Sequence, residues 1–151
     1  PGMLVKIDDK QEYKLFIVYK IGSNKIKTIN NLDRIQNRIY KLSMQNYPEL
    51  NDDLYITGCH ALLKTTLTEQ EQKDMITHFG KIYITGKKYR FMTYLDNKAE
   101  PYIADHEYEE IWHLALESDD KNINYGIYAN GLLIETCSIN FINNKSNLKF
   151  K

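Results

Sequence analysis

Several residue types and patterns are scarce in this chain of 151 residues, and each shortage excludes a class of protein. Two cysteines are too few for a disulfide framework, so we expect reduced thiols and a reducing compartment. No apolar run approaches the length of a membrane span, and the opening residues, PGMLVKI, lack the layout of a secretion signal. We therefore expect no membrane partner, and a location in a reducing compartment such as the cytoplasm.

Charge of one sign is also lacking. The 20 basic and 20 acidic residues cancel, so nothing indicates a surface for nucleic acid or anionic lipid. Lysine, isoleucine and asparagine are abundant while arginine is rare, which is typical of AT-rich coding. The sequence does not begin with Met, and we expect it to follow a processing event or to belong to a longer gene product.

Short β-branched and aromatic runs dominate what is present. They include LVKI (4–7), YKLFIVYKI (13–21), NKIKTI (24–29), LYIT (54–57) and IWHLALE (111–117). Turn residues separate them, and Gly22-Ser23, Gly86 and Asn130-Gly131 each predict a hairpin. The segment 32–42 fits either a helix or a strand, 100–110 reads as an exposed acidic stretch, and a short strand is predicted at Ile139–Ile142. The pattern predicts a mainly β fold.

One helix is predicted, at about 67–79 within TLTEQEQKDMITHFG. Thr68 followed by Glu71 has the spacing of a capping box, and Gly80 is a typical stop. Cysteine and histidine lack the repeated close spacing of a zinc site, so we expect no metal and no other cofactor. Cys59 with His113 could serve a cysteine hydrolase, although His113 also fits a half-buried strand histidine with a satisfied hydrogen bond.

Two stretches, LYITGCHALL (54–63) and IWHLALESDDKNINYGIYANGLLIETCS (111–138), together resemble the hedgehog/intein (Hint) autoprocessing domain. The first carries the Thr-x-x-His motif of that family as Thr57 and His60. The second matches its closing pattern of two strands, with an Asn-Gly turn before the last. PGMLVKI is similar to the strand that follows the family's first catalytic strand. The resemblance is closest to Hint domains of large DNA viruses.

The resemblance implies a single Hint-like domain over residues 1–151, a horseshoe of bent β-hairpins that lacks its first catalytic strand. In such a domain Thr57 would hydrogen-bond around a scissile peptide bond, and His60 would protonate the departing nitrogen with a pKa near neutrality. His113 would help to activate the nucleophile, in a position where the family often has Asp. Cys137 would stand where the residue after the splice junction lies, although a cysteine packed as a small hydrophobe is the alternative.

Two departures from the family limit the expected activity. The first nucleophile, Cys or Ser, would lie roughly 20–30 residues before Pro1. Glu135-Thr136 replaces the His-Asn that splicing needs, since threonine cannot cyclise. The resemblance thus predicts self-cleavage of an upstream segment, which is its own substrate, through a thioester and without splicing. The alternative is an inactive structural or interaction module, for example a component of a viral particle with protein partners, and an unrelated β domain is a third interpretation.

Overall fold

The structure is a computed structural model that describes residues 2–6, 13–145 and 148–150, with the backbone alone for 2–6 and 13–17. Its elements follow one another in this order: β1 (Gly2–Lys6), β2 (Tyr13–Lys27), β3 (Ile39–Leu42), β4 (Leu54–Thr57), β5 (Ala61–Lys64), α1 (Glu69–Phe79), β6 (Ile84–Thr85), β7 (Lys88–Met92), the 3-10 turn η1 (Thr93–Leu95), β8 (Glu100–Pro101), β9 (Tyr108–Leu116), β10 (Gly126–Ala129), β11 (Leu132–Glu135), α2 (Ile139–Asn144) and β12 (Lys149–Phe150).

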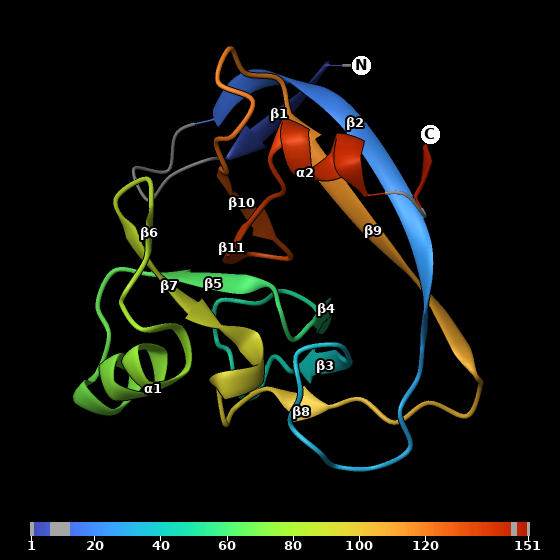
Figure 1. The fold of residues 1–151 in the computed structure, drawn as a ribbon, viewed down its shortest axis with the longest axis vertical. Helices are drawn as coiled ribbons and strands as arrows, with labels where there is room; N and C mark the ends of the chain where they lie inside the picture. The colour runs from blue at the N-terminus through green and yellow to red at the C-terminus, as the bar shows by residue number, and fades with distance from the viewer. Residues whose placement is uncertain (1, 7–12, 146–147, 151) are drawn as a thin grey trace.

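The fold is mainly β, as predicted, with 39% of the chain in strands and 15% in helices. One sheet joins β1, β2, β9 and β12 and curls into a half-barrel, a second has the order β10-β11-β5-β7-β6, and a third has the order β4-β3-β8. Figure 1 shows the long strands β2 and β9 running side by side along one flank, with α1 at the opposite lower corner. No helix in the described part of the chain is long and apolar enough to cross a membrane.

The hairpin predicted at Gly22-Ser23 is wrong, because β2 runs unbroken from Tyr13 to Lys27. Gly22 lies within the strand, where it pairs with β9 on one side and with β12 on the other. A Cβ atom added to Gly22 would lie 3.2 Å from the side chain of Leu148. The glycine therefore marks the close approach of a distant segment and not a turn.

The helix predicted at about 67–79 is confirmed as α1. The Thr68 hydroxyl accepts from the backbone N–H of Glu71, whose carboxylate accepts from the backbone N–H of Thr68, which completes the capping box. Gly80 ends the helix in the left-handed conformation. The Glu71 carboxylate also pairs with Lys64 of β5 at 2.5 Å, which attaches the start of the helix to the second sheet.

The Asn-Gly hairpin is present as β10 and β11. Asn130 has φ 49° and Gly131 has φ 97°, the pair of positive values that a two-residue type I′ turn requires. The turn also contacts a loop far away in the sequence. The backbone N–H of Asn51 donates to the Asn130 carbonyl, and a Cβ on Gly131 would lie 2.4 Å from the carbonyl oxygen of Glu49.

The ambiguous segment 32–42 forms no helix in the structure. It is an irregular stretch that becomes β3 at Ile39, held by the buried guanidinium of Arg38. Arg38 donates to four backbone carbonyls, those of Ile29, Asn31, Asp33 and Tyr102. A helix over 32–42 would use the Asp33 carbonyl internally, so its bond to the Arg38 side chain favours the extended path.

The short strand predicted at Ile139–Ile142 is wrong, since these residues form α2. The hydroxyl of Ser138 caps the helix by accepting from the N–H of Phe141. Ile139 and Ile142 are three apart, so they share one helix face and pack with Ala115 of β9. The acidic stretch 100–110 contains no buried residue and is largely exposed, as expected, and its ends belong to β8 and β9.

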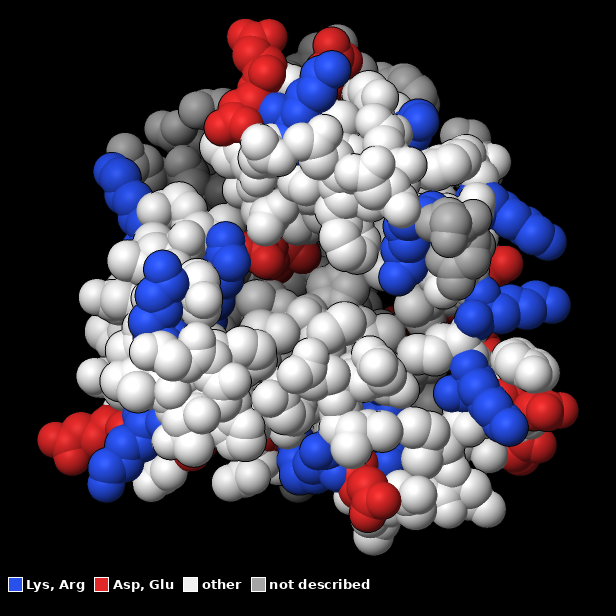
Figure 2. Space-filling model, in the orientation of Figure 1, with Lys and Arg blue, Asp and Glu red and all other residues white. Residues whose placement is uncertain are grey.

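Acidic and basic side chains are scattered over the face shown in Figure 2, with no large field of one sign. The same face is hollowed near its centre, and acidic atoms are visible in the hollow. The largest buried cluster lies beneath the second and third sheets, and includes Tyr40, Leu42, Leu62 and Ile134. This cluster supports the strands that carry the site described next.

Candidate functional site

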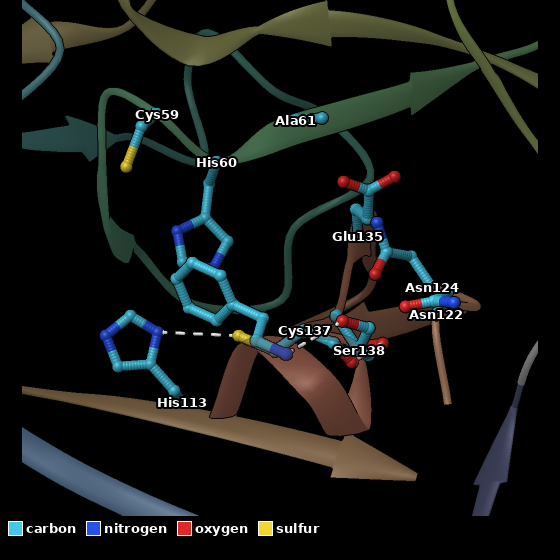
Figure 3. A pocket seen from close by; sticks show the side chains of 11 residues that line it. Cys59, His60, Ala61, His113, Asn122, Asn124, Glu135, Cys137 and Ser138 are labelled. Atoms are coloured by element: carbon cyan, nitrogen blue, oxygen red, sulfur yellow. Dashed lines mark hydrogen bonds between the residues drawn. The ribbon is translucent and has the colours of Figure 1, made fainter. Parts of the chain in front are cut away.

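A cavity of about 330 Å³ lies where the turn after β4, strand β9 and the segment from β11 to α2 meet (Figure 3). Its lining contains two thiols, two imidazoles and several amide and hydroxyl groups. The lining residues are Cys59, His60, Ala61, His113, Asn122, Asn124, Glu135, Thr136, Cys137, Ser138 and Phe141. Three segments that are distant in the sequence therefore contribute reactive side chains to one space.

The Thr-x-x-His motif forms a turn at the end of β4, in which Thr57 and His60 are hydrogen-bonded to each other. The Thr57 hydroxyl oxygen lies 3.0 Å from Nδ1 of His60, and the backbone N–H of His60 donates to the Thr57 carbonyl at 3.0 Å. The turn depends on Gly58, because a Cβ there would lie 2.8 Å from the Tyr40 ring and 2.9 Å from the Ile35 carbonyl oxygen. With Nδ1 occupied in this way, Nε2 is the ring nitrogen that is available to the cavity.

His60 is held as a neutral imidazole. Part of its surface borders the cavity, but the protein packed around the ring removes most of its hydration. This burial, with a smaller contribution from His113, lowers the pKa of His60 from 6.5 to about 4. The expected pKa near neutrality is therefore wrong, and the cause is desolvation. At pH 7 the ring carries a single N–H proton and no positive charge, so it can donate one hydrogen bond and accept a second proton.

His113 projects from β9 toward the same space. It is 6% exposed, and its ring lies parallel to that of His60, with centroids 6.2 Å apart. Nδ1 is 3.7 Å from the sulfur of Cys137, while Nε2 is buried and has no hydrogen-bond partner within the described residues. The alternative interpretation is a strand histidine with a satisfied hydrogen bond. It holds for Nδ1 of His113 and not for Nε2. Burial, assisted by Lys145, lowers the pKa of His113.

The polar run ETCS (135–138) is accounted for by the route of the chain across the site. Glu135 pairs with Arg90 at 2.7 Å, and the Thr136 N–H donates to the Tyr125 carbonyl. Cys137 then crosses to β9, where its N–H donates to the Leu114 carbonyl and it forms an isolated bridge with Ala115. Ser138 caps α2 immediately afterwards. Each residue therefore connects the last hairpin to another part of the fold.

Cys137 is protonated at rest. Burial raises the pKa of its thiol from 9.0 to about 11, and Cys59 and Glu135 act in the same direction against an opposing effect of Lys145. Such a thiol becomes a nucleophile only when a base removes its proton during attack. Nδ1 of His113 is in the position to do so. Figure 3 shows the Cys137 sulfur directed at the His113 ring, with the His60 ring pointing down toward them.

The structure brings together all four residues that the sequence indicated, Thr57, His60, His113 and Cys137. The sequence also suggested a cysteine-hydrolase pair of Cys59 and His113, but in the structure His113 contacts Cys137. Cys59 is exposed and its sulfur lies 3.3 Å from the Thr57 hydroxyl, while the sulfur next to His113 belongs to Cys137.

Several lining residues were missed by sequence analysis, namely Asn122, Asn124, Ser138 and Phe141. The asparagines lie in a loop and α2 was not predicted, so no local pattern pointed to them. Within the described residues, no group of three or more His, Cys, Asp and Glu side chains is placed to hold a metal ion.

Comparison of the chain with family models, with curated proteins and with solved structures finds no match. The site is therefore interpreted from its own geometry.

Proposed function

We propose that this chain is a Hint-type autoprocessing module that cleaves or transfers an upstream segment of its own polypeptide through a thioester. The supporting observation is that His60, His113 and Cys137 line one cavity, while the Thr57 hydroxyl lies against His60 and the Cys137 sulfur lies against His113. Thiol, base and hydrogen-bond donor are the groups that acyl transfer requires.

The chemistry begins with an upstream Cys or Ser that takes up the preceding acyl group, an exchange of an amide for a thioester or ester. When the Thr57 hydroxyl donates to Nδ1 of His60, the proton of that imidazole is on Nε2 and can form a hydrogen bond to the scissile amide. The neutral imidazole acts as a hydrogen-bond donor and keeps its proton. The C–N bond of the amide breaks as the C–S or C–O bond forms, and the proton lost by the attacking thiol or hydroxyl is the one taken up by the leaving nitrogen. Desolvation strengthens such a hydrogen bond as charge develops on the reacting group.

Cys137 is the acceptor in the second step. Its sulfur attacks the thioester carbonyl, its proton passes to Nδ1 of His113, and the upstream thiolate leaves and takes up a proton. The products are an acyl group on Cys137 and a free upstream thiol, so bonds and protons balance. Hydrolysis of the new thioester releases the segment. Thr136 stands where cyclisation would need asparagine, so the reaction ends in cleavage and not in splicing.

The test uses the gene product with its segment before Pro1 included. We expect purified precursor to cleave itself, faster with hydroxylamine, into two fragments on a gel. His60→Ala should abolish cleavage, Cys137→Ala should leave hydroxylamine-dependent cleavage intact, and His78→Ala on the exposed face of α1 should have no effect. Precursor that remains intact with hydroxylamine, or in which no Cys or Ser opens an upstream strand, contradicts the proposal.

A second candidate is a non-catalytic module that binds protein partners. It is favoured by the raised pKa of Cys137, since the resting thiol is not activated, and by the threonine at position 136. The same precursor experiment separates the two candidates. A non-catalytic module shows no thioester and no fragment at any pH, and His60→Ala then changes only stability.

A further inference from the structure

His60 and Thr57 also border a second cavity, of about 460 Å³, whose lining does not include Cys137. This cleft lies between β4 of the third sheet and β9 of the half-barrel. Its lining is mostly apolar, and consists of Ile39, Leu54, Tyr55, Ile56, Thr57, His60, Tyr102, Glu109, Glu110, Ile111, Trp112, Leu114, Ile127, Ala129 and Ile134. Every residue of β4 belongs to this lining, so the cleft runs along the edge of the strand and not over one face.

β4 is an edge strand of its sheet. The Gly58 N–H donates to the Arg38 carbonyl, so alternate residues before it direct their backbone groups toward β3. Tyr55 and Thr57 lie between those residues and direct theirs outward. The Thr57 carbonyl already accepts from the His60 N–H, so the edge offers an added strand the N–H and C=O of Tyr55 and the N–H of Thr57. An edge with outward N–H and C=O groups is a ready partner for another strand.

The facing edge of β9 has the same property. The Thr28 N–H donates to the Glu107 carbonyl. In the antiparallel register, every second residue of β9 after Glu107 therefore directs its backbone N–H and C=O toward β2. Tyr108 and Glu110 are the intervening positions and turn their backbone groups away from β2. Further along, the outward carbonyl of Leu114 already accepts from the N–H of Cys137. Figure 1 shows β9 passing diagonally beside the sheet that holds β3 and β4.

Charge distinguishes one end of the cleft. Glu109 is paired with His106, whereas the exposed Glu110 makes no ion pair within the described residues. The lining contains no Lys or Arg. A segment that fits this cleft therefore has apolar side chains along its length and a basic side chain near Glu110.

We propose that the cleft takes an extended upstream segment of the same polypeptide as an added strand, which pairs with the edges of β4 and β9 and places a basic residue against Glu110. This rests on the proposed function, for which it supplies the substrate class. The backbone of the added strand would lie beside Thr57 and His60, and Cys137 would lie in the first cavity. His60 would then stand between the acyl donor and the acceptor thiol.

The chain contains a reporter for this cleft. Trp112 is the single tryptophan, lines the cleft and is 50% exposed, so a bound strand should shift its fluorescence emission to shorter wavelength. The probe is the synthetic peptide acetyl-Lys-Val-Thr-Ile-Ser-Val-Thr-amide, titrated into the 151-residue protein. A second peptide has proline in place of the central isoleucine, which removes a backbone donor, and should bind about tenfold more weakly or worse.

Charge reversal tests the end of the cleft. Glu110→Lys should weaken binding of the lysine peptide by about threefold to fivefold, as expected for an exposed ion pair, and a peptide that begins with glutamate should recover the loss. Glu117→Lys is the matched control, since Glu117 is exposed at the end of β9 but does not line the cleft. Ile111→Thr, which keeps a β-branched strand residue, should also weaken binding, with unchanged circular dichroism.

No emission shift, or equal shifts with the two peptides, overturns the proposal. A shift that depends on protein concentration without peptide also overturns it, because the occupant is then a second copy of the chain. Binding measured in Cys137→Ala keeps this result separate from the proposed function. Strand binding without self-cleavage of the precursor contradicts the function alone, and self-cleavage without strand binding contradicts the cleft alone.

Discussion

Lowering the pH should destabilise the folded protein through His60. Burial and the neighbouring His113 lower its pKa from 6.5 to about 4 in the folded state. Each unit of difference between the folded and unfolded pKa corresponds to about 1.4 kcal/mol. The shift of His60 therefore amounts to a loss of up to about 3 kcal/mol in the free energy of unfolding, a large fraction of the stability of a small domain.

The direction of the effect follows from which state binds the proton. Between pH 6.5 and 4 the unfolded chain protonates this histidine while the folded chain does not. Stability is therefore complete above pH 6.5 and is lost progressively as the pH falls toward 4. Burial also lowers the pKa of His113, which adds to the loss in the same direction.

Urea unfolding at pH 7.5, 6.5, 5.5 and 4.5 measures this loss, and His60→Asn isolates it. We expect the wild type to lose stability relative to the variant by about 2 to 3 kcal/mol across that range. His78→Asn is the control, because His78 is exposed on α1, and it should follow the wild type. A difference between wild type and His60→Asn that does not change with pH would refute a desolvated neutral imidazole at the site.

Three further predictions concern other parts of the fold. Arg38→Met should destabilise the protein by about 3 kcal/mol or more in urea unfolding, because four backbone carbonyls lose a buried partner. Gly131→Ala should cost more than about 1 kcal/mol, because φ is 97° and the new Cβ would meet the Glu49 carbonyl, whereas Gly86→Ala would meet no atom and should cost less. Iodoacetamide at pH 7.5 should alkylate exposed Cys59 at least about tenfold faster than Cys137, as read by mass spectrometry, since burial raises the pKa of Cys137 to about 11. Equal labelling of the two cysteines would contradict the buried, protonated state of Cys137.

The elements predicted correctly are those whose signals are local. The capping box of Thr68 and Glu71 and the Asn130-Gly131 turn complete their hydrogen bonds within a few residues, so the sequence contains the whole interaction. The alternation in IWHLALE likewise predicted β9, which begins three residues earlier. Mainly β character follows from such short patterns.

The errors lie where a distant segment decides the local structure. Gly22 looks like a turn residue, but it lies inside a continuous strand. Its lack of a Cβ leaves room for the side chain of Leu148. From the local sequence, Ile139 and Ile142 fit a short strand as well as a helix. Their packing with Ala115 of β9 favours the helix. In both cases the partner is more than twenty residues away, so no window along the chain contains it.

For the site, the sequence by itself determined the candidates Thr57, His60, His113 and Cys137, through motif spacing and a family resemblance. Only the tertiary structure decided that His60, His113 and Cys137 share a cavity with Thr57 against His60, that Cys137 and not Cys59 contacts His113, and that His60 is neutral. The reason is physical. A pKa and a hydrogen-bond partner depend on everything packed around a side chain, and that packing comes from strands that meet only when the chain has folded.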